Sequence, residues 1–412
     1  MSDSHREKQA TLSENCHAPT KFTLIIPAFN EEGAISETLE SALRSRGKIL
    51  QSTPIQKMDI LLVDDGSVDG TLRIAEQFAD ILRVHFSKNR GYGAAIKAGF
   101  KATDAQILGF MDADGTCDPL CFIALIQRLF QKNADVVLGS RLNPGTQMPW
   151  VRKLGNKIFA RLIGWVSGQK LTDVASGIRV IRRESLKKMV PLPDGLHFTP
   201  AMSAIAVLDP RLRIEEIPVD YRERVGRSKL KIIKDGILFL SSILFASLCY
   251  NPLRISFSLS FGLAFFATGL SFYSSQNPGG EKAGQFMAAA LLFLSVLSLF
   301  SGLLAHQANY LLIGARRIPG AFGSLLVKIA DGKTLIFGGA LLCLLSALAA
   351  GSTVLFLRPP EFLSIVLTLL LALGGWIAME GILLRIIWAA RQKQKAELED
   401  PFTAQPPSER NP

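Results

Sequence analysis

The chain has 412 residues, of which 48 % are hydrophobic and 20 % are charged, and its formal net charge at pH 7 is +11. Mean hydropathy is positive while the charged fraction is that of an ordinary soluble protein, so the apolar residues must be concentrated in one part of the chain. They lie after about residue 236, which favours a membrane domain over a second soluble core.

The five cysteines are scattered without the paired spacing of a zinc site, and they indicate reduced thiols in a cytoplasmic head. The excess of Lys and Arg is expected to face the anionic inner leaflet, where each well-placed cation contributes about 1 kcal/mol. A nucleic-acid partner is not expected, because the cations gather beside apolar segments without interleaved aromatic residues. Residues 1–20 are polar and lack the apolar core of a signal peptide, so we expect a disordered arm there.

Short apolar runs alternate with helical patterns from residue 21 onward. Strands are predicted at residues 21–26, where Pro27 ends the run, and at 60–63, 81–86, 105–110 and 134–138, with helices at 34–43, at 72–78 and after residue 91. Such alternation implies right-handed crossovers and a mostly parallel sheet, with a ligand crevice outside the carboxyl ends of the strands. The predicted fold class is therefore α/β for residues 21–231, followed by an all-α membrane domain.

The segment Met111-Asp112-Ala113-Asp114-Gly115-Thr116 leaves the predicted sheet directly after the strand at 105–110. Two carboxylates one residue apart supply the hard oxygen ligands that Mg²⁺ or Mn²⁺ prefers, and such a cation can neutralise a diphosphate. An Asp-x-Asp triplet alone is also common in turns. Gly91-x-Gly93 resembles half of a dinucleotide fingerprint, but the acidic residue that should follow is missing, so a dinucleotide-binding domain is not expected.

The Asp-x-Asp triplet is stronger evidence when it is read together with three other motifs that precede it in a fixed order. The four motifs are Pro27-x-x-Asn30-Glu31, Asp64-Asp65-Gly66-Ser67-x-Asp69-Gly70-Thr71, Asn89-x-Gly91-x-Gly93-Ala94-Ala95 and Met111-Asp112-Ala113-Asp114. Together they resemble the family 2 inverting glycosyltransferases with the GT-A fold, and within them the polyprenyl-phosphate sugar transferases typified by dolichol-phosphate mannose synthase. The resemblance covers about residues 21–231. It implies transfer of a hexose from a nucleotide-diphosphate sugar, of the GDP-mannose or UDP-glucose type, to polyprenyl or dolichyl phosphate with inversion.

The resemblance also implies roles for single residues on the donor side. The residues expected to bind the nucleotide sugar are Pro27, Phe29, Glu31, Asp64, Asp65 and Asp112. Asp112 and Asp114 are expected to hold Mg²⁺ or Mn²⁺ on the donor diphosphate. The family often carries Gln where this chain has Thr116, whose hydroxyl is the candidate third ligand.

On the acceptor side, the resemblance implies that Arg141, Arg152 and Asn156 bind the phosphate of the lipid. Arg152 and Asn156 are four residues apart, which places them on one face of a helix. Asp173, in the segment Asp-x-x-Ser-Gly-Ile-Arg, is expected near the transferred sugar. Residues 195–200 are expected to influence the choice of sugar.

The last motif of the head, residues 217–229, matches the Pro-Val…Arg…Gly-x-Ser-Lys element of the family. The match assigns catalytic roles to Arg224 and Lys229, beside Asp114 and Asp173, and leaves Arg222 as an alternative to Arg224.

Four apolar segments in the region 251–390 approach or exceed the length of about 20 residues that spans a bilayer: 255–273, 286–305, 334–357 and 362–388. The apolar run at 237–248 is shorter, so residues 232–250 are predicted to form an interfacial juxtamembrane helix. The distribution of Lys and Arg places the catalytic head and both termini in the cytoplasm, with a disordered tail at 391–412. This orientation fails if residues 237–248 also cross the membrane.

Three alternatives stay open. A polysaccharide synthase would share the head but normally carries Gln-x-x-Arg-Trp, which this sequence lacks. A transferase that acts on diacylglycerol or ceramide would need a base for its alcohol acceptor, and Asp173 is the candidate. A non-enzymatic membrane scaffold or lipid transporter with a degenerate head is disfavoured by the intact acidic motifs.

Overall fold

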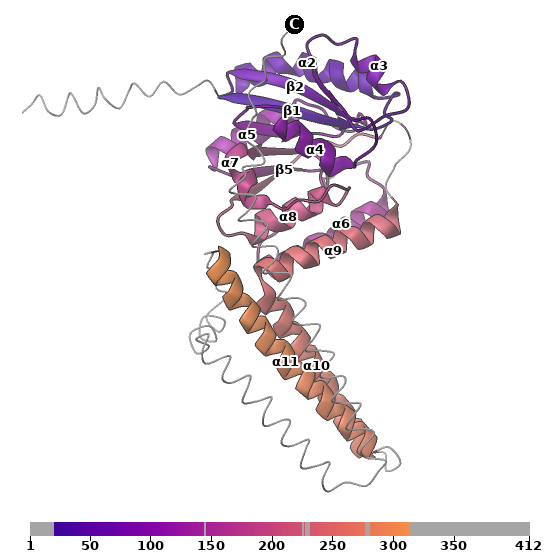
Figure 1. Cartoon of the computed structure of the whole chain (residues 1–412), viewed down its shortest axis with the longest axis vertical. Helices are drawn as coiled ribbons and strands as arrows, with labels where there is room; N and C mark the ends of the chain where they lie inside the picture. Colours follow the sequence, from indigo (N-terminus) through magenta and orange to yellow (C-terminus); the bar gives the residue numbers. More distant parts are fainter. Residues whose placement is uncertain (1–19, 144–145, 225, 227–230, 277–280, 314–412) are drawn as a thin grey trace, which may run out of the picture.

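The computed structural model describes residues 20–143, 146–224, 226, 231–276 and 281–313 of the chain. An α/β head stands on a long pair of helices, and another helix runs along the surface of the head that faces this pair (Figure 1). The predicted spans at 334–357 and 362–388, the tail at 391–412 and nearly all of the predicted arm lie outside the described residues.

The strands of the head are β1 (Lys21–Ala28), β2 (Lys57–Asp64), β3 (Leu82–His85), β4 (Ile107–Phe110), β5 (Val136–Ser140), β6 (Arg179–Arg182) and β7 (Ile214–Pro218). Within the described residues these seven strands form one sheet in the order β3-β2-β1-β4-β6-β5-β7. β6 runs antiparallel to β4 and β5, and the other neighbouring pairs are parallel. The mostly parallel α/β sheet predicted from the sequence is thus confirmed.

Helices cover both faces of this sheet. They are α2 (Ile35–Ser52), α3 (Thr71–Ala75), α4 (Tyr92–Lys101), α5 (Cys121–Gln131), α6 (Trp150–Ser167), α7 (Arg183–Leu186), the 3₁₀ turn η1 (Lys187–Met189) and α8 (Phe198–Leu208). Along β1, Phe22, Leu24 and Ile26 join a hydrophobic cluster with α2 and α5, whereas Ile25 joins a second cluster with α4 and α8. Because successive side chains of a strand point to opposite faces, the alternation explains why this strand is apolar throughout.

The prediction that Pro27 ends the first strand was wrong, because β1 continues through Pro27 to Ala28. Pairing of β1 with β4 ends at Ile25, whereas pairing with β2 continues to Ala28. Proline lacks a backbone N–H, and strands accept it where pairing on one side has stopped. Pro27 therefore lies in the part of β1 that pairs with β2 but no longer with β4.

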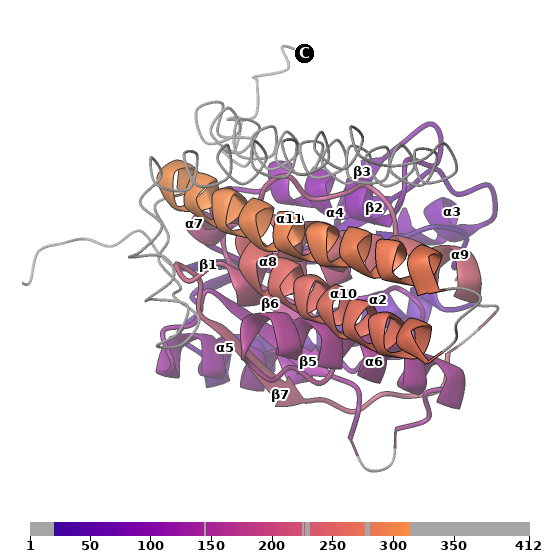
Figure 2. The same ribbon diagram turned by 90° about the horizontal axis from the view of Figure 1, so that it is seen from below.

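The remaining described helices are α9 (Ile232–Tyr250), α10 (Pro252–Ser275) and α11 (Glu281–Ile313). α9 packs along α8 and α6, while α10 and α11 lie side by side and project away from the head (Figures 1 and 2). The spans predicted at 255–273 and 286–305 fall within α10 and α11. Among the described residues, α9 and α10 are long and apolar enough to cross a membrane, by length and composition alone. The interfacial placement of α9 stays a prediction.

The end of α6 is tied to the start of α10. Arg254 donates to the carbonyl oxygens of Trp165 and Val166 at 2.5 and 3.3 Å, and Asn251 Nδ2 donates to Val166 at 2.8 Å. Helix ends leave carbonyl groups without intrahelical partners, and these side chains satisfy two of them. These hydrogen bonds fix the position of the end of α6 relative to the hairpin that α10 and α11 form.

Replacing Gly93 by Ala should destabilise the head. Gly93 lies in the first turn of α4, where a β-carbon would collide with the carbonyl oxygen of Pro193 and lie 2.9 Å from the Phe198 side chain. Overpacking of this kind costs about 1–3 kcal/mol, so the apparent melting temperature of the detergent-purified protein should fall. Gly47→Ala in α2 is the matched control, since its β-carbon would meet nothing within 4 Å and alanine favours helix. Equal melting temperatures for the two variants would contradict this account.

Candidate active site

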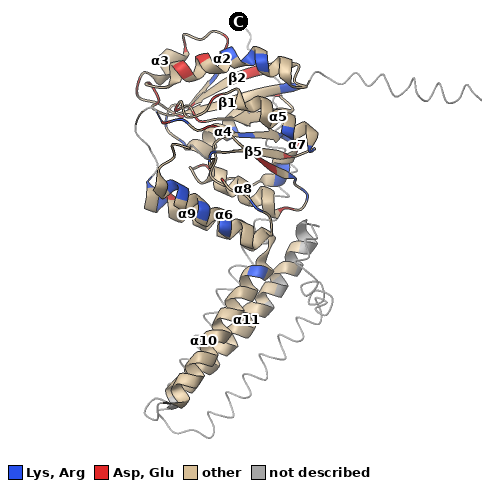
Figure 3. Ribbon diagram, turned by 180° about the vertical axis from the view of Figure 1, so that it is seen from behind, with Lys and Arg blue, Asp and Glu red and all other residues tan. Residues whose placement is uncertain are grey.

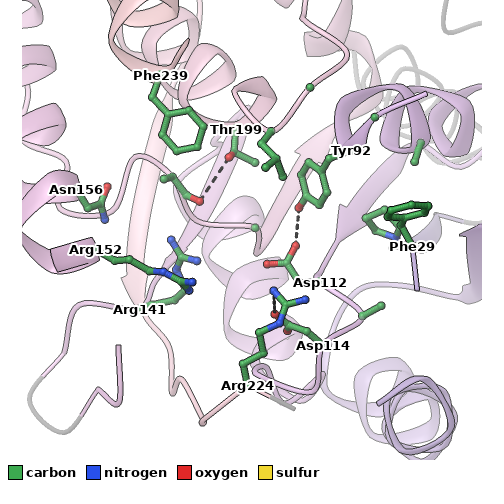
Figure 4. A pocket seen from close by; sticks show the side chains of 18 of the residues that line it. Phe29, Tyr92, Asp112, Asp114, Arg141, Arg152, Asn156, Thr199, Arg224 and Phe239 are labelled. Atoms are coloured by element: carbon green, nitrogen blue, oxygen red, sulfur yellow. Dashed lines mark hydrogen bonds and ion pairs between the residues drawn. The ribbon is translucent and has the colours of Figure 1, made fainter. Parts of the chain in front are cut away.

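A cavity of about 540 Å³ opens at the carboxyl ends of the parallel strands, where the sequence predicts a ligand crevice (Figure 4). Segments that follow β1, β2, β4 and β5 form one part of its wall, and α6, α8 and α9 form the other. The predicted site residues that line it are Pro27, Phe29, Glu31, Asp65, Asp112, Asp114, Arg141, Arg152, Asn156 and Arg224.

Three predicted site residues, Asp64, Thr116 and Asp173, are buried outside the lining of this cavity. Asp64 accepts hydrogen bonds from Ser67 and lies 2.7 Å from His85 Nδ1, so its carboxylate shapes the turn after β2. Lys229 lies outside the described residues.

Asp65 is the member of the Asp64-Asp65 pair that reaches the cavity. Its carboxylate accepts the backbone N–H groups of Arg90 and Gly91 at 2.7 and 2.9 Å. Asp65 therefore holds the loop before α4 against the end of β2, and its predicted contact with the base or ribose stays a prediction.

The carboxylate of Asp112 accepts a hydrogen bond from Tyr92 Oη at 2.6 Å, as Figure 4 shows. Burial and the neighbouring charge of Asp114 raise the pKa of Asp112 to about 6. Two carboxylates forced together in a poorly hydrated site favour either a proton or a cation between them. A bound cation would neutralise the negative charge of such a pair.

Asp114 is held from two sides. Thr116 Oγ1 donates to its Oδ1 at 2.6 Å, and Arg224 Nη1 lies 3.2 Å from its Oδ2. Arg224 also contacts Glu31 Oε1 at 2.6 Å, whereas Arg222 pairs with the partly exposed Asp118 outside the cavity. Of the two arginines left open by the sequence, Arg224 is therefore the one that enters the site.

The residues present fit a hard divalent cation. Among the described residues, no group of three His, Cys, Asp or Glu gathers to enclose a metal. Mg²⁺ and Mn²⁺ accept such a sparse site, because they bind through one or two carboxylates and take further ligands from water and substrate phosphates. Asp112 and Asp114 supply those two carboxylates, and the guanidinium beside Asp114 indicates that the site already attracts positive charge. Thr116, whose hydroxyl is engaged by Asp114, stays a predicted ligand.

Asp173 is a fully buried acceptor at the centre of a hydrogen-bond network. Arg141 donates from Nε and Nη2 at 2.7 and 2.9 Å and from its backbone N–H at 2.9 Å, and Asn156 Nδ2 donates at 2.7 Å. Burial alone would raise the pKa of Asp173, but the charge and hydrogen bonds of Arg141 outweigh burial and hold it below the usual value. Contact with Asp173 likewise raises the pKa of Arg141 against the opposing effect of burial. The pair fixes Arg141 at the cavity wall.

The far end of the cavity is apolar. Phe159 of α6 and Phe239 of α9 face each other with ring centroids 6.0 Å apart, and Met148, Val151 and Ile232 line the same end. The cavity thus passes from acidic groups, through arginines, to a crevice between two helices. A ligand that fills it must be polar at one end and hydrophobic at the other.

The chain is similar in sequence to known glycosyltransferases. The sequence profile of glycosyl transferase family 2 matches residues 23–190. A dolichyl-phosphate hexose transferase from Haloferax volcanii is 31 % identical over 54 % of this chain and 92 % of its own length. The chain belongs to glycosyl transferase family 2. A dodecaprenyl-phosphate galacturonate synthase from Rhizobium johnstonii is 28 % identical over 70 % of this chain and 87 % of its own length.

This family 2 protein is a glycosyltransferase with the α/β fold that the sequence motifs predict. A solved structure of glucosyl-3-phosphoglycerate synthase from Mycobacterium tuberculosis, in complex with Mn²⁺, UDP-glucose and phosphoglyceric acid, is also similar. It has 20 % sequence identity and a TM-score of 0.45, and the match covers 55 % of this chain and 80 % of that chain.

Some residues that line the cavity were not predicted from the sequence, and others were predicted only as part of a segment. Tyr92 lies within the Asn-x-Gly-x-Gly motif but carries no signal of its own, because its role depends on meeting Asp112 from another strand. Gly195, Leu196 and Thr199 fall in the segment 195–200, where the sequence suggested an influence on sugar choice. Their position on the cavity wall is compatible with that prediction without testing it.

Replacing Asp173 by Asn should destabilise the part of the cavity wall that contains Arg141 and Asn156. An Asn amide would turn one donor toward Arg141, which would leave a buried guanidinium without its counter-ion. Removing one partner of a buried ion pair costs about 3–5 kcal/mol, so the apparent melting temperature should fall sharply. Glu37→Gln, which breaks the exposed pair with Arg44 at 2.7 Å, should leave the melting temperature unchanged. A stable Asp173→Asn variant would show that Arg141 does not depend on this pair.

Proposed function

We propose that this glycosyltransferase moves a hexose from a nucleotide-diphosphate sugar to the phosphate of a polyprenyl or dolichyl phosphate, inverting the anomeric carbon. The observation that carries the proposal is the course of the cavity, from Pro27 and Phe29 past two carboxylates to arginines and an apolar crevice. The names of the two relatives, which specify dodecaprenyl and dolichyl phosphate, support the same class of acceptor.

The donor would occupy the part of the cavity formed by the ends of β1, β2 and β4. Phe29 and Asp65 border the space for the nucleoside, and Asp112 and Asp114 would hold Mg²⁺ or Mn²⁺ against the diphosphate. The cation, when bound, would stabilise negative charge on the departing nucleoside diphosphate. Arg224, which already bridges Glu31 and Asp114, is close enough to the same region to add a second positive charge.

The acceptor phosphate would bind beside Arg141, Arg152 and Asn156. A phosphate is anionic near neutral pH, so it can attack the sugar without a strong base, and the protein has only to align and desolvate it. Asp173 supports this choice over an alcohol acceptor. Its oxygens already accept hydrogen bonds from Arg141 and Asn156, its pKa is lowered, and it does not line the cavity, so it is poorly suited to act as a base.

The surface around the apolar crevice suits a bilayer. Figure 3 shows that Lys and Arg residues occur along α6 and α9, on the side of the head nearest the helical hairpin. Lys157 and Arg161 alternate with an exposed stripe of α6 that consists of Trp150, Leu154, Ile158 and Trp165. The exposed face of α9 carries Ile233, Ile237, Leu240 and Leu244. Amphipathic helices of this composition lie in the membrane interface, which would bring a lipid phosphate to the mouth of the crevice.

A panel assay tests the proposed reaction. The full-length protein in detergent micelles would receive UDP-sugars and GDP-sugars with undecaprenyl phosphate, dolichyl phosphate, diacylglycerol or ceramide. We expect a glycolipid that retains one phosphate and requires Mg²⁺ or Mn²⁺, and we expect Asp112→Asn to abolish it. A product formed only on diacylglycerol or ceramide would replace the proposed acceptor, and the absence of any sugar transfer would leave a membrane scaffold as the better explanation.

The apolar crevice generates a separate prediction. Phe239→Ala should raise the KM for a long polyprenyl phosphate about tenfold and leave the KM for the sugar donor unchanged, because a buried Phe side chain contributes about 1.5–3 kcal/mol. Phe261→Ala on the exposed face of α10 is the matched control. An increase confined to the donor KM would place the lipid elsewhere.

A further inference from the structure

The side chain of Tyr92 occupies a special position in the donor half of the cavity. Tyr92 is the first residue of α4, it lines the cavity, and its hydroxyl donates to Asp112 Oδ1 at 2.6 Å. Figure 4 shows the ring reaching from α4 across to the segment that follows β4. The hydrogen bond therefore joins two elements whose relative position is set by the fold and not by the local sequence.

The first turns of α4, which carry Tyr92, are held in place by contacts with the segment before α8. The backbone N–H of Ala94 donates to the carbonyl oxygen of Asp194 at 3.0 Å. Lys97 Nζ donates to the carbonyl oxygen of Leu192 at 2.8 Å and contacts Asp194 Oδ1 at 2.5 Å. These contacts clamp the first turns of α4 to the segment before α8, so the hydroxyl of Tyr92 is presented from a fixed point.

Asp112 is confined on its other side by Gly177. A β-carbon at position 177 would lie 2.5 Å from Asp112 Oδ2 and 2.6 Å from Oδ1, so only glycine leaves room for the carboxylate. With Tyr92 on one oxygen and the Gly177 backbone close to both, the carboxylate has little freedom to rotate. Tyr92 uses one lone pair of Oδ1, and Asp112 lines the cavity, so its carboxylate keeps acceptor capacity for a ligand.

We propose that Tyr92 is a positioning residue for the donor cation, whose hydroxyl holds Asp112 in the orientation that binds Mg²⁺ or Mn²⁺ while Gly177 leaves the space for it. The inference rests on the proposed metal-dependent transfer. Groups that orient metal ligands through hydrogen bonds typically change metal affinity by about 10- to 100-fold when they are removed. Thr116 holds Asp114 in the same way, so each carboxylate of the pair has its own hydroxyl donor.

The test is Tyr92→Phe in the full-length protein, which removes the hydroxyl and keeps the ring. Binding of Mn²⁺ would be followed by electron paramagnetic resonance with Mn²⁺ alone and with added UDP or GDP. We expect the dissociation constant for Mn²⁺ to rise about 10- to 100-fold with an unchanged melting temperature. Transfer should show a raised KM for Mn²⁺, and a kcat that recovers largely at saturating Mn²⁺. Tyr273→Phe on the exposed face of α10 is the control for loss of a tyrosine hydroxyl.

The variant Asp112→Asn distinguishes a failure of the proposed role of Tyr92 from a failure of the proposed function. If wild type and Tyr92→Phe bound Mn²⁺ equally while Asp112→Asn did not, the role of Tyr92 would be overturned and the proposed function would stand. If the wild type transferred sugar at full rate in the presence of a chelator, both the cation site and the role of Tyr92 would be overturned. A loss of kcat that saturating Mn²⁺ did not restore would also overturn a positioning role.

Discussion

The part of the cavity that we propose for the acceptor depends on the buried carboxylate of Asp173. Burying a charge is costly unless hydrogen bonds of good geometry replace the lost water, and Asp173 receives them from Arg141 and Asn156 at 2.7–2.9 Å. The backbone N–H groups of Thr172 and Asp173 are in turn fixed by Glu216 of β7, at 2.8 Å each. One network thus joins the end of β5, the middle of α6 and the edge strand of the sheet. It sets the place of Arg141 before any ligand arrives, and such preorganisation is what makes a fixed charge effective on a bound phosphate.

The two halves of the cavity are built from different kinds of structure, and under the proposed function this division would let one protein bind a soluble donor and a lipid. The donor half comes from loops at the ends of β1, β2 and β4, where backbone geometry at the sheet edge brings acidic residues together. The acceptor half comes from α6 and α9, whose outer faces are apolar and basic and whose inner faces line the crevice. The tie from Arg254 to the end of α6 keeps this half at a constant distance from the hairpin of α10 and α11.

The sequence predicts the position of some cavity residues better than others, and the reason is physical. Asp112 and Asp114 follow a buried strand directly, so a short pattern is enough to place them at the sheet edge. The prediction that Asp173 lies near the transferred sugar stays a prediction. Its hydrogen-bond partners lie 32 and 17 positions away, so no local pattern reveals that they enclose it. The choice between Arg222 and Arg224 was open for the same reason, because it is decided by the distant Asp118 and Glu31.

The pair Asp112 and Asp114 combines rigidity with unbalanced charge. Flexible carboxylates could move apart to relieve their repulsion, but a hydroxyl holds each of these in place. Burial, together with the charge of Asp114, raises the pKa of Asp112. Both oxygens of Asp114 are already engaged, one by Thr116 and one by Arg224. Any cation that binds this carboxylate must share Oδ2 with Arg224 or displace the guanidinium from it. Because Arg224 also links the acidic pair to Glu31, a cation bound at Asp114 would repel this guanidinium and weaken its contact with the carboxylate.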